Sequence, residues 1–295
     1  MPYCIPDRNR TNSHPFGHGA DTRSLGGERV EQPLPAERHR RILEVLRERQ
    51  AVRVSTLSDL LGVSEVTVRR DLEELEQRGS LERTHGGAIS TQRMGPEPAY
   101  VEAIARNAAE KEAIGEAAAR FVEPGDTVFL NGGTTTLQVF RHLDSPGVRV
   151  VTNHVGMALE ATDRNLDLLL VGGDFRPPSN SCVGGFAADT LRRVYATKAF
   201  IGVEGVARRS GLTSPVAEEA DVARLMIEQT RGEVIVVADH TKLGTVADFA
   251  IAPLSVASRM VTDSGIDEEY RDDLRNMGVE VVVADERVGA PSRGG

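Results

Sequence analysis

The chain has 295 residues, of which 40% are hydrophobic and 27% are charged, and its formal net charge is −9. These values are typical of a globular protein with more than one domain, and they exclude a disordered or collagen-like chain. Because Cys4 and Cys182 are the only cysteines, a disulfide framework and a cysteine-based metal cluster are also excluded. We therefore expect a cytoplasmic protein with no cofactor, no metal site and no membrane partner.

The N-terminal end of the chain precedes a predicted helical region. Residues 1–35 are rich in Pro, Gly, His, Asn and Arg and lack apolar periodicity, so we expect a disordered extension; we expect the same of residues 288–295. Residues 36–49 are predicted to form a helix with Ile42, Leu43 and Leu46 on its inner face.

Two shorter helices are predicted to meet at Gly62. The first spans residues 56–61 with Ser55 as its N-cap, and the second opens at another N-cap residue, Ser64. Val68, Leu72 and Leu75 follow at i, i+4 and i+7, which places them on one buried face of the second helix. This pattern is typical of a helix-turn-helix.

A β-hairpin is predicted directly after these helices. The β-prone runs 81–85 and 88–90 flank Gly86-Gly87, which is a hairpin signal. Three helices followed by a hairpin form a winged helix-turn-helix, which we assign to residues 36–92. This region has as many acidic as basic residues, so one copy is expected to bind DNA weakly. We therefore expect a homodimer or homotetramer that reads repeated half-sites.

Polar side chains in the first turns of the second helix point to recognition of double-stranded DNA. A helix-turn-helix presents these turns to the major groove, where Arg can make two hydrogen bonds to guanine. An Arg-Arg pair also occurs on ordinary solvated helices, so the argument depends on the order of the surrounding elements. The residues predicted to contact DNA are Arg53, Ser55, Ser64, Glu65, Thr67, Arg69, Arg70, Arg83 and His85.

A linker (93–99) and a larger α/β domain (100–287) are predicted next. Residues 100–121 form an alanine-rich helical stretch interrupted by Gly115. Strands then alternate with helices, which predicts a Rossmann-like parallel sheet covered on both faces, with its ligand at the carboxyl edge. The predicted strands are 127–130, 148–152, 167–171, 199–203, 233–238, 260–261 and 279–283.

The loops at this edge are suited to a phosphorylated sugar. Residues 131–136 combine glycines, which allow close approach, with threonine hydroxyls and a helix N-terminus that can bind phosphate. Such a turn can also be purely structural, as can each residue that the other loops contribute. The residues predicted to bind the effector are Asn131, Gly132, Gly133, Thr134, Thr135, Thr136, Asn153, Gly172, Gly173, Arg176, Glu204, Asp239 and Lys242.

Motifs in both halves resemble the DeoR family of bacterial transcriptional regulators. They are Arg38, Ile42, Leu46, Ser64, residues 67–72 and 83–88, then Asn107, 110–111, 133–135, 151–153, 172–173, Arg176, 183–184, 198–202, 211–213, 218–220, Asp239 and Lys242. The resemblance implies a C-terminal domain similar to sugar-phosphate isomerases and deaminases that senses a phosphorylated sugar. Asn131 and Glu204 stand where the family usually has Asp, and Ala103 stands where Arg is common.

The leading hypothesis is a DNA-binding repressor of carbohydrate-metabolism genes that a phosphorylated sugar releases. A second hypothesis is that the C-terminal domain retains sugar-phosphate isomerase or deaminase activity, with Glu204 and Lys242 as acid–base groups on opposite sides of a substrate carbon. A third is that this domain serves only oligomerisation. We expect the first, with no catalytic residues and no enzymatic activity.

Overall fold

The computed structural model describes residues 33–49, 51–84, 86–90, 92–93, 98–164 and 166–284. The predicted C-terminal tail and His85, and all but residues 33–35 of the predicted N-terminal extension, lie outside these ranges. Within them, no helix has both the length and the hydropathy that a membrane crossing requires.

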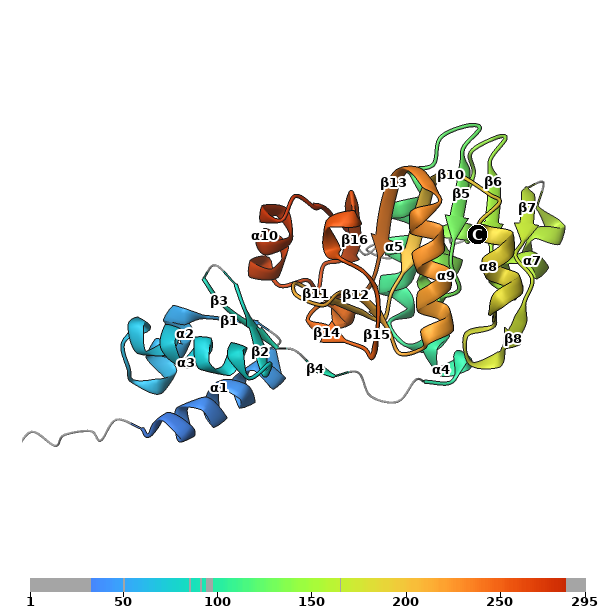
Figure 1. Ribbon diagram of the computed structural model, residues 1–295. Helices are drawn as coiled ribbons and strands as arrows, with labels where there is room; N and C mark the ends of the chain where they lie inside the picture. Colours follow the sequence, from blue (N-terminus) through green and yellow to red (C-terminus); the bar gives the residue numbers. More distant parts are fainter. Residues whose placement is uncertain are drawn as a thin grey trace, which may run out of the picture. The chain divides into compact units, whose positions relative to one another are not determined.

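The first elements form a winged helix-turn-helix, as predicted (Figure 1). The helices are α1 (Pro35–Arg49), α2 (Val54–Leu61) and α3 (Glu65–Gln77). The strands β1 (Ala51–Arg53), β2 (Leu81–Arg83) and β3 (Gly87–Ser90) form an antiparallel sheet in the order β1-β3-β2. The strand β1 was not predicted from the sequence, because it is only three residues long.

The ends of α2 and α3 are set by local backbone preferences. The predicted cap at Ser55 is wrong, because α2 begins at Val54 and the extended residue before it, Arg53, occupies the cap position. Gly62 ends α2 with a φ of 64°, a conformation that glycine adopts without a steric penalty. The predicted cap at Ser64 is confirmed, since its side chain accepts a hydrogen bond from the Thr67 N–H.

A buried ion pair joins α1 to α3. Asp71 is only 3% exposed, and its two carboxylate oxygens accept hydrogen bonds of 2.6 and 2.8 Å from the Arg38 guanidinium. This pairing also raises the pKa of Arg38. Around it, Ile42, Leu57 and Leu72 are fully buried. The position of α3 is therefore fixed both by apolar packing and by a two-pronged charged contact.

The rest of the chain is built on a seven-stranded parallel sheet. Its order is β17-β16-β13-β10-β5-β6-β7, and all six neighbouring pairs are parallel. This confirms the predicted α/β class. The strands are β5 (Thr127–Leu130), β6 (Arg149–Thr152), β7 (Asp167–Leu170), β10 (Ala196–Gly202), β13 (Thr230–Val237), β16 (Arg259–Asp263) and β17 (Glu280–Ala284).

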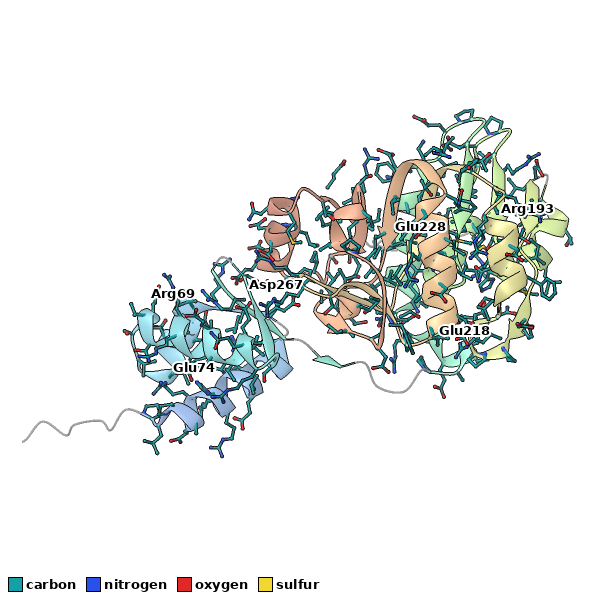
Figure 2. The ribbon with its side chains drawn as sticks, in the orientation of Figure 1. Arg69, Glu74, Arg193, Glu218, Glu228 and Asp267 are labelled. Atoms are coloured by element: carbon teal, nitrogen blue, oxygen red, sulfur yellow. The ribbon has the colours of Figure 1, made fainter. Side chains whose placement is uncertain are left out.

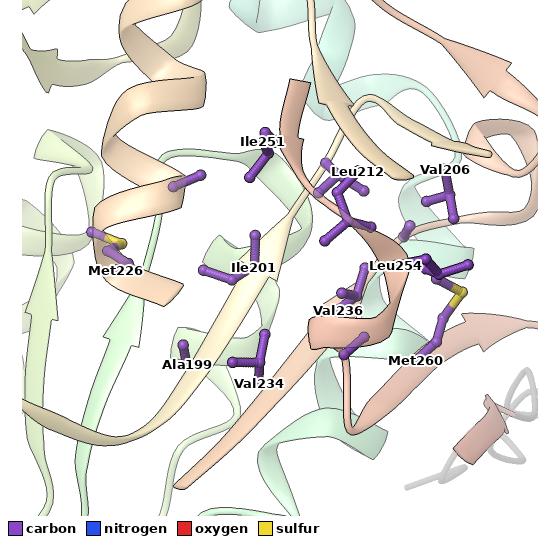
Figure 3. Close-up of a cluster of buried hydrophobic side chains, with 14 of the residues drawn as sticks. Ala199, Ile201, Val206, Leu212, Met226, Val234, Val236, Ile251, Leu254 and Met260 are labelled. Atoms are coloured by element: carbon purple, nitrogen blue, oxygen red, sulfur yellow. The ribbon is translucent and has the colours of Figure 1, made fainter. Parts of the chain in front are cut away.

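Helices cover both faces of this sheet. One face packs against α8 (Gly185–Leu191), α9 (Ala217–Glu228) and α10 (Glu268–Asn276). The other packs against α5 (Ala108–Ala119), α6 (Thr134–Arg141) and α7 (Val155–Glu160). Within β5, Phe129 belongs to the first cluster, whereas Val128 and Leu130 belong to the second. Figure 3 shows the first cluster, in which labelled side chains of β10, β13 and α9 meet.

Several smaller elements of this part of the chain were not predicted. β11 (Gly205–Ala207), β12 (Gly211–Ser214) and β15 (Phe249–Ala252) form an antiparallel sheet. β8 (Asp174–Arg176) pairs with β9 (Ser181–Val183), and β4 (Gln92–Arg93) pairs with β14 (Thr245–Val246). The short helices are η1 (Ala161–Asp163), η2 (Pro177–Ser179), η3 (His240–Lys242) and η4 (Leu254–Val256).

The expected helix over residues 100–121 is two helices, α4 (Tyr100–Ala105) and α5. The break is at Asn107, which has a φ of 51° and directly precedes α5. Gly115, where we expected the interruption, lies inside α5. A Cβ atom at Gly115 would be 2.5 Å from the backbone carbon of Gln138 on α6. Glycine is therefore required there by the close approach of two helices, not by a bend.

We predict that Gly115→Ala destabilises the chain. In an open helix this substitution stabilises by about 0.5–1 kcal/mol. Here the new methyl group meets the backbone of α6, and overpacking of this kind costs about 1–3 kcal/mol. The free energy of unfolding, measured by denaturant titration, is expected to fall. Gly185→Ala is the control, because no atom lies within 4 Å of a Cβ at that helical glycine. A gain in stability at position 115 would contradict the close approach.

Candidate functional sites

The N-terminal turns of α3 have the properties of a DNA-reading surface. Val68, Asp71, Leu72 and Leu75 are buried, so the opposite side of the helix faces solvent. The hydroxyl groups of Ser64 and Thr67 lie 2.9 Å apart at the start of the helix. They are positioned to donate to phosphate or base acceptors.

Two exposed arginines, Arg69 and Arg70, follow on the same helix, and Figure 2 labels the first of them. The side chains of Arg69 and Arg70 are 57% and 82% exposed. Arg69 lies 2.9 Å from Glu65, and Arg70 lies 3.9 Å from Glu74. Exposed pairs of this kind contribute only about 0–1 kcal/mol, so both guanidinium groups can exchange their acidic neighbours for DNA at low cost.

Val66 is a residue of this surface that the sequence analysis missed. Its side chain is 76% exposed, although it is apolar and lies in the first turn of α3. An exposed aliphatic group at this place is suited to contact with the methyl group of thymine. The signal was available in the sequence, because Val66 falls off the apolar face set by Val68, Leu72 and Leu75.

The remaining residues predicted to bind DNA lie outside α3. Arg53 and Ser55 are exposed at the start of α2. Arg83 is half-buried on β2, and its backbone N–H donates to the Glu76 carboxylate at 3.1 Å. Arg53 and Ser55 therefore lie one helix before Arg69 and Arg70, whereas Arg83 belongs to the wing.

A second candidate site is a cavity of about 60 Å³ at the carboxyl ends of β5, β10 and β13. Residues 131–135 line it from the β5–α6 loop. Glu204, Asp239 and Lys242 line it from the ends of β10 and β13. These eight were all predicted effector residues. Pro98, Ala103, Arg106, Lys111, residues 202–203, Ser214, Glu219, Ala223 and Ile251 complete the lining.

Two buried amide side chains hold the β5–α6 loop. Asn131 donates to the Gly202 carbonyl at 2.9 Å and accepts from the Gly202 N–H at 2.8 Å. Asn153, which is 1% exposed, accepts from the Gly132 N–H at 2.8 Å and donates to the Cys182 carbonyl at 2.9 Å. Both were predicted to bind the effector, yet their hydrogen bonds are directed to the backbone. They position the loop.

The N-terminus of α6 opens into the cavity. No side chain caps this helix, and Thr134 and Thr135 of its first turn line the cavity. Thr136 points inward instead, where it donates to the carbonyl groups of Asn131 and Gly133. Uncapped first-turn amides and the positive end of the helix dipole form a site suited to a phosphate group.

Two lysines lie beside this helix end. Lys242 forms an ion pair with Glu204. Lys111 is 5% exposed, and its ammonium group donates to the Ala103 carbonyl at 2.6 Å. Burial lowers the pKa of Lys111, and the nearby Asp239 carboxylate opposes that shift. Because a buried ammonium gains strongly from an added anion, Lys111 favours phosphate binding.

Lys111 was not among the predicted effector residues, although the lysine content of the sequence offered a signal. The chain contains only three lysines, Lys111, Lys198 and Lys242, among many arginines. Two of the three line the cavity. Arg106 and Ser214 also line it and were likewise missed, because nothing in their sequence context distinguishes them.

Five predicted effector residues do not line the cavity: Thr136 and Asn153, described above, and Gly172, Gly173 and Arg176. Gly172 and Gly173 follow β7, which lies at the edge of the sheet, three places from β10. Arg176 on β8 pairs with Glu219 at 3.0 Å, and Glu219 lines the cavity from α9. Arg176 therefore contacts the cavity wall but does not form it.

The arrangement of the charged groups argues against acid–base catalysis. The isomerase hypothesis requires Glu204 and Lys242 on opposite sides of a substrate carbon, but the two side chains are hydrogen-bonded to each other. Asp239 is 1% exposed and accepts a hydrogen bond from Asn107 at 2.9 Å. No cluster of three His, Cys, Asp or Glu side chains that could hold a metal ion occurs among the residues in the described ranges.

The short helix α4 is anchored at both ends. At its start the Tyr100 hydroxyl lies 2.9 Å from Nε2 of His154, and near its end the Ala103 carbonyl accepts from Lys111. His154 is fully buried, and burial lowers its pKa to about 4. Its Nδ1 accepts from the Met157 N–H at 3.2 Å, so the neutral ring carries its proton on Nε2 and donates to Tyr100.

We predict that His154 makes stability depend on pH between about 6.5 and 4. The folded chain binds this proton less readily than the unfolded chain, whose pKa is near the ordinary 6.5. Stability is therefore retained above about pH 6.5 and falls as the pH drops, by about 2 kcal/mol at pH 5. Denaturant titrations of His154→Gln should show a smaller loss of unfolding free energy between pH 6.5 and 5. Tyr100→Phe should keep the full pH dependence, because burial is the main cause of the lowered pKa of His154. An unchanged pH dependence in His154→Gln would contradict the assignment to His154.

Comparisons with known proteins agree with this geometry. A model of the DeoR-like helix-turn-helix domain matches residues 38–94, and a model of the DeoR C terminal sensor domain matches residues 106–264. The HTH-type transcriptional regulator GlpR of Haloferax volcanii is 37% identical over 250 residues, covering 84% of this chain and 98% of that protein. The HTH-type transcriptional repressor GlcR of Bacillus subtilis is 32% identical over 249 residues, covering 84% and 96%.

Among solved structures, ribose 5-phosphate isomerase A from Methanocaldococcus jannaschii is similar at 16% identity and a TM-score of 0.35. The match covers 46% of this chain and 55% of the isomerase chain. The two domain matches and the full-length relatives identify the protein itself. The chain is a DNA-binding transcriptional regulator of the DeoR family.

Proposed function

We propose that the chain is a repressor of carbohydrate-metabolism genes that is released from its operator by a phosphorylated sugar. The observation that carries this proposal is the position of α4. This helix lies in the sequence between the DNA-binding elements and the α/β sheet, and its Ala103 forms part of the cavity wall. An occupant of the cavity therefore contacts the segment that leads to the DNA-binding elements.

The DNA-binding half of the proposal is supported by the exposed turns of α3. Arg69 and Arg70 are accessible, and Val66 and Thr67 add apolar and hydroxyl groups beside them. Each bidentate contact between Arg and guanine contributes about 1–3 kcal/mol of base discrimination. Because α3 is fixed by the Arg38–Asp71 pair, these side chains are presented on a rigid element.

The sensor half is supported by the chemistry of the cavity. The α6 N-terminus, Lys111 and Lys242 favour a phosphate group, and Asp239 and Glu204 are suited to sugar hydroxyls. A neutral sugar would leave the buried ammonium of Lys111 with no anionic ligand. We infer that the phosphate is required for binding, and that the sugar hydroxyls set the choice among phosphorylated sugars.

The size of the cavity supports coupling between the two halves. Its volume is about 60 Å³, whereas ligand pockets commonly measure roughly 300–1,000 Å³. A sugar phosphate therefore enters only if a wall moves. Most of the wall belongs to the sheet and its helices, but Pro98 and Ala103 belong to the linker and α4. Phosphate that draws the Lys111 ammonium away from the Ala103 carbonyl would favour a displaced α4.

The proposal has three further parts: repression, oligomerisation and location in the cell. GlcR is named a repressor, which supports repression here. Equal numbers of basic and acidic residues in the DNA-binding region favour a homodimer or homotetramer over a single copy. Action on chromosomal DNA requires a cytoplasmic location.

We predict that Arg69→Ala and Arg70→Ala each weaken operator binding by roughly 5- to 150-fold, and that the double variant binds no specific site. The probe is a duplex selected from a random library with the wild-type chain, and the readout is a gel shift with a scrambled duplex beside it.

Arg78→Ala is the matched control for this experiment. Arg78 is an exposed arginine at the other end of the same helix, so its loss should leave specific affinity nearly unchanged. Equal losses at all three positions would indicate a general charge effect. Wild-type affinity in both Arg69→Ala and Arg70→Ala would refute the recognition surface.

We predict that a phosphorylated sugar raises the melting temperature of the wild-type chain. At a hundredfold excess over Kd the folded state gains about 2.7 kcal/mol, which corresponds to roughly 5–10 °C. Pentose and hexose phosphates are screened by thermal shift beside the same sugars without phosphate and inorganic phosphate alone. The active compound should also dissociate the selected duplex.

Lys111→Met should lose this rise, whereas Lys198→Met should keep it. Lys198 is the matched control, because it is also buried but pairs with Asp126 and Glu123 outside the cavity. A rise retained in Lys111→Met would refute the assigned phosphate site. Conversion of one sugar phosphate into another, lost in Lys242→Ala, would establish the isomerase alternative instead.

A further inference from the structure

Exposed apolar side chains gather beside one edge of the main sheet. Leu170 ends β7 and is 40% exposed, Phe175 on β8 is 54% exposed, and Phe186 on α8 is 78% exposed. All three lie within five residues, along the sequence, of a place where two segments of the chain come into close contact. There the backbone of Gly173 approaches Val183 and Ala187, so that a Cβ atom at Gly173 would lie 2.4 Å from the Val183 carbonyl oxygen. We call Leu170, Phe175 and Phe186 the edge patch.

The edge patch borders a strand with a free side. In the part of the chain that the structure describes, β7 pairs with β6 and with no other strand, so the sheet ends there. α7, which packs on β7, carries the exposed Leu159 on the opposite face of the sheet, outside the edge patch. Single exposed apolar residues are ordinary, but a group of them around an open sheet edge marks a contact surface.

The apolar area is more than half of what one side of a stable dimer contact needs. A whole aromatic side chain offers about 150–250 Å². With the observed exposures, the edge patch presents roughly 250–400 Å² of apolar surface. A standard interface buries about 800 Å² on each partner, of which about 56–65% is apolar. The edge patch therefore supplies more than half of the apolar part of one half-interface.

The charges around the patch are self-complementary. α8 begins beside the exposed Asp174, whose carboxylate lies 2.5 Å from the position of a Cβ at Gly184. The same helix is followed by the exposed Arg193 (Figure 2), while its C-cap residue Arg192 pairs with Asp189 of the helix at 2.8 Å. In a two-fold arrangement, α8 would pack antiparallel to its own copy. The acidic start of each helix then meets the basic end of the other.

We propose that the edge patch is the contact between two copies of this chain, related by a two-fold axis that pairs α8 with α8. This inference deepens the proposed function, because it locates the dimerisation that reading of repeated half-sites requires. The contact lies on the side of β7 and α8, whereas the effector cavity lies at the ends of β5, β10 and β13. The two surfaces can therefore be tested separately.

The first experiment measures the mass of the full chain by light scattering at micromolar concentrations. The wild type is expected to be a dimer or a larger even assembly. Phe186→Glu places two carboxylates at the centre of the contact and should weaken it by roughly 100-fold or more. Phe249→Glu is the control, because Phe249 is 43% exposed on β15, outside the patch. A monomeric wild type, or an unchanged mass in Phe186→Glu, would overturn the proposal.

The second experiment tests the antiparallel pairing by charge exchange. Asp174→Arg and Arg193→Asp each create like charges across the two-fold axis, so each variant alone should be monomeric. Mixed together, they restore both attractive contacts and should form a heterodimer. An unfolded variant would not be rescued in this way. Two monomers that fail to associate on mixing would refute the pairing.

Failure of the proposed contact can be distinguished from failure of the proposed function. The effector cavity lies elsewhere, so monomeric Phe186→Glu should keep the thermal shift with a phosphorylated sugar while losing tight binding to the selected duplex. Unchanged mass with normal effector and duplex binding would reject only this contact. A dimeric wild type that binds neither duplex nor any sugar phosphate would reject only the proposed function.

Discussion

The reciprocal hydrogen bonds between Asn131 and Gly202 are the constraint on which the sensor site depends. They join the ends of β5 and β10, and so they fix where the β5–α6 loop begins and where the first turn of α6 points. Asn suits this position because it offers both a donor and an acceptor, whereas an ionised Asp could only accept. The replacement of the family's usual Asp therefore has a structural meaning: the amide satisfies the Gly202 carbonyl as well as its N–H.

The helix α4 is the wall of this site that is held by side-chain contacts and not by strand pairing. These contacts include Tyr100 with His154 and with Asn180, and Lys111 with the Ala103 carbonyl, whereas the opposite walls are sheet strands with continuous pairing. An effector whose phosphate drew Lys111 away from the Ala103 carbonyl would remove one of these contacts. The differential contact needed to shift a conformational equilibrium can thus be assigned to one ammonium group and one carbonyl group.

Sequence periodicity predicted most of the fold because both halves follow simple rules. The i, i+4, i+7 pattern around Val68 identified α3, and the apolar runs identified the strands of the parallel sheet. The antiparallel strands near Glu204 were missed because they are short and carry no alternating pattern. The break at Asn107 was missed because an alanine-rich stretch favours one continuous helix, and only tertiary contacts such as that with Asp239 reveal the interruption.

Only part of the candidate site could be predicted, because the spatial order of the strands in the sheet cannot be read from the sequence. β5, β10 and β13 are neighbours in space but far apart in sequence, and their loops supply the cavity. The loop after β7 has equally suitable glycines, yet it lies at the sheet edge and does not line the cavity. Lys111 lies on α5, which precedes β5, the first strand of the parallel sheet. The predicted effector residues were taken from loops that follow strands, so Lys111 was missed.

The small volume of the cavity also has a kinetic consequence. A ligand that fits only after a wall has moved cannot bind faster than the wall opens, so its association rate should level off at high concentration. The same wall slows escape once it has closed again. The regulator would then respond to a sustained rise in effector concentration and not to a brief one, without any additional component.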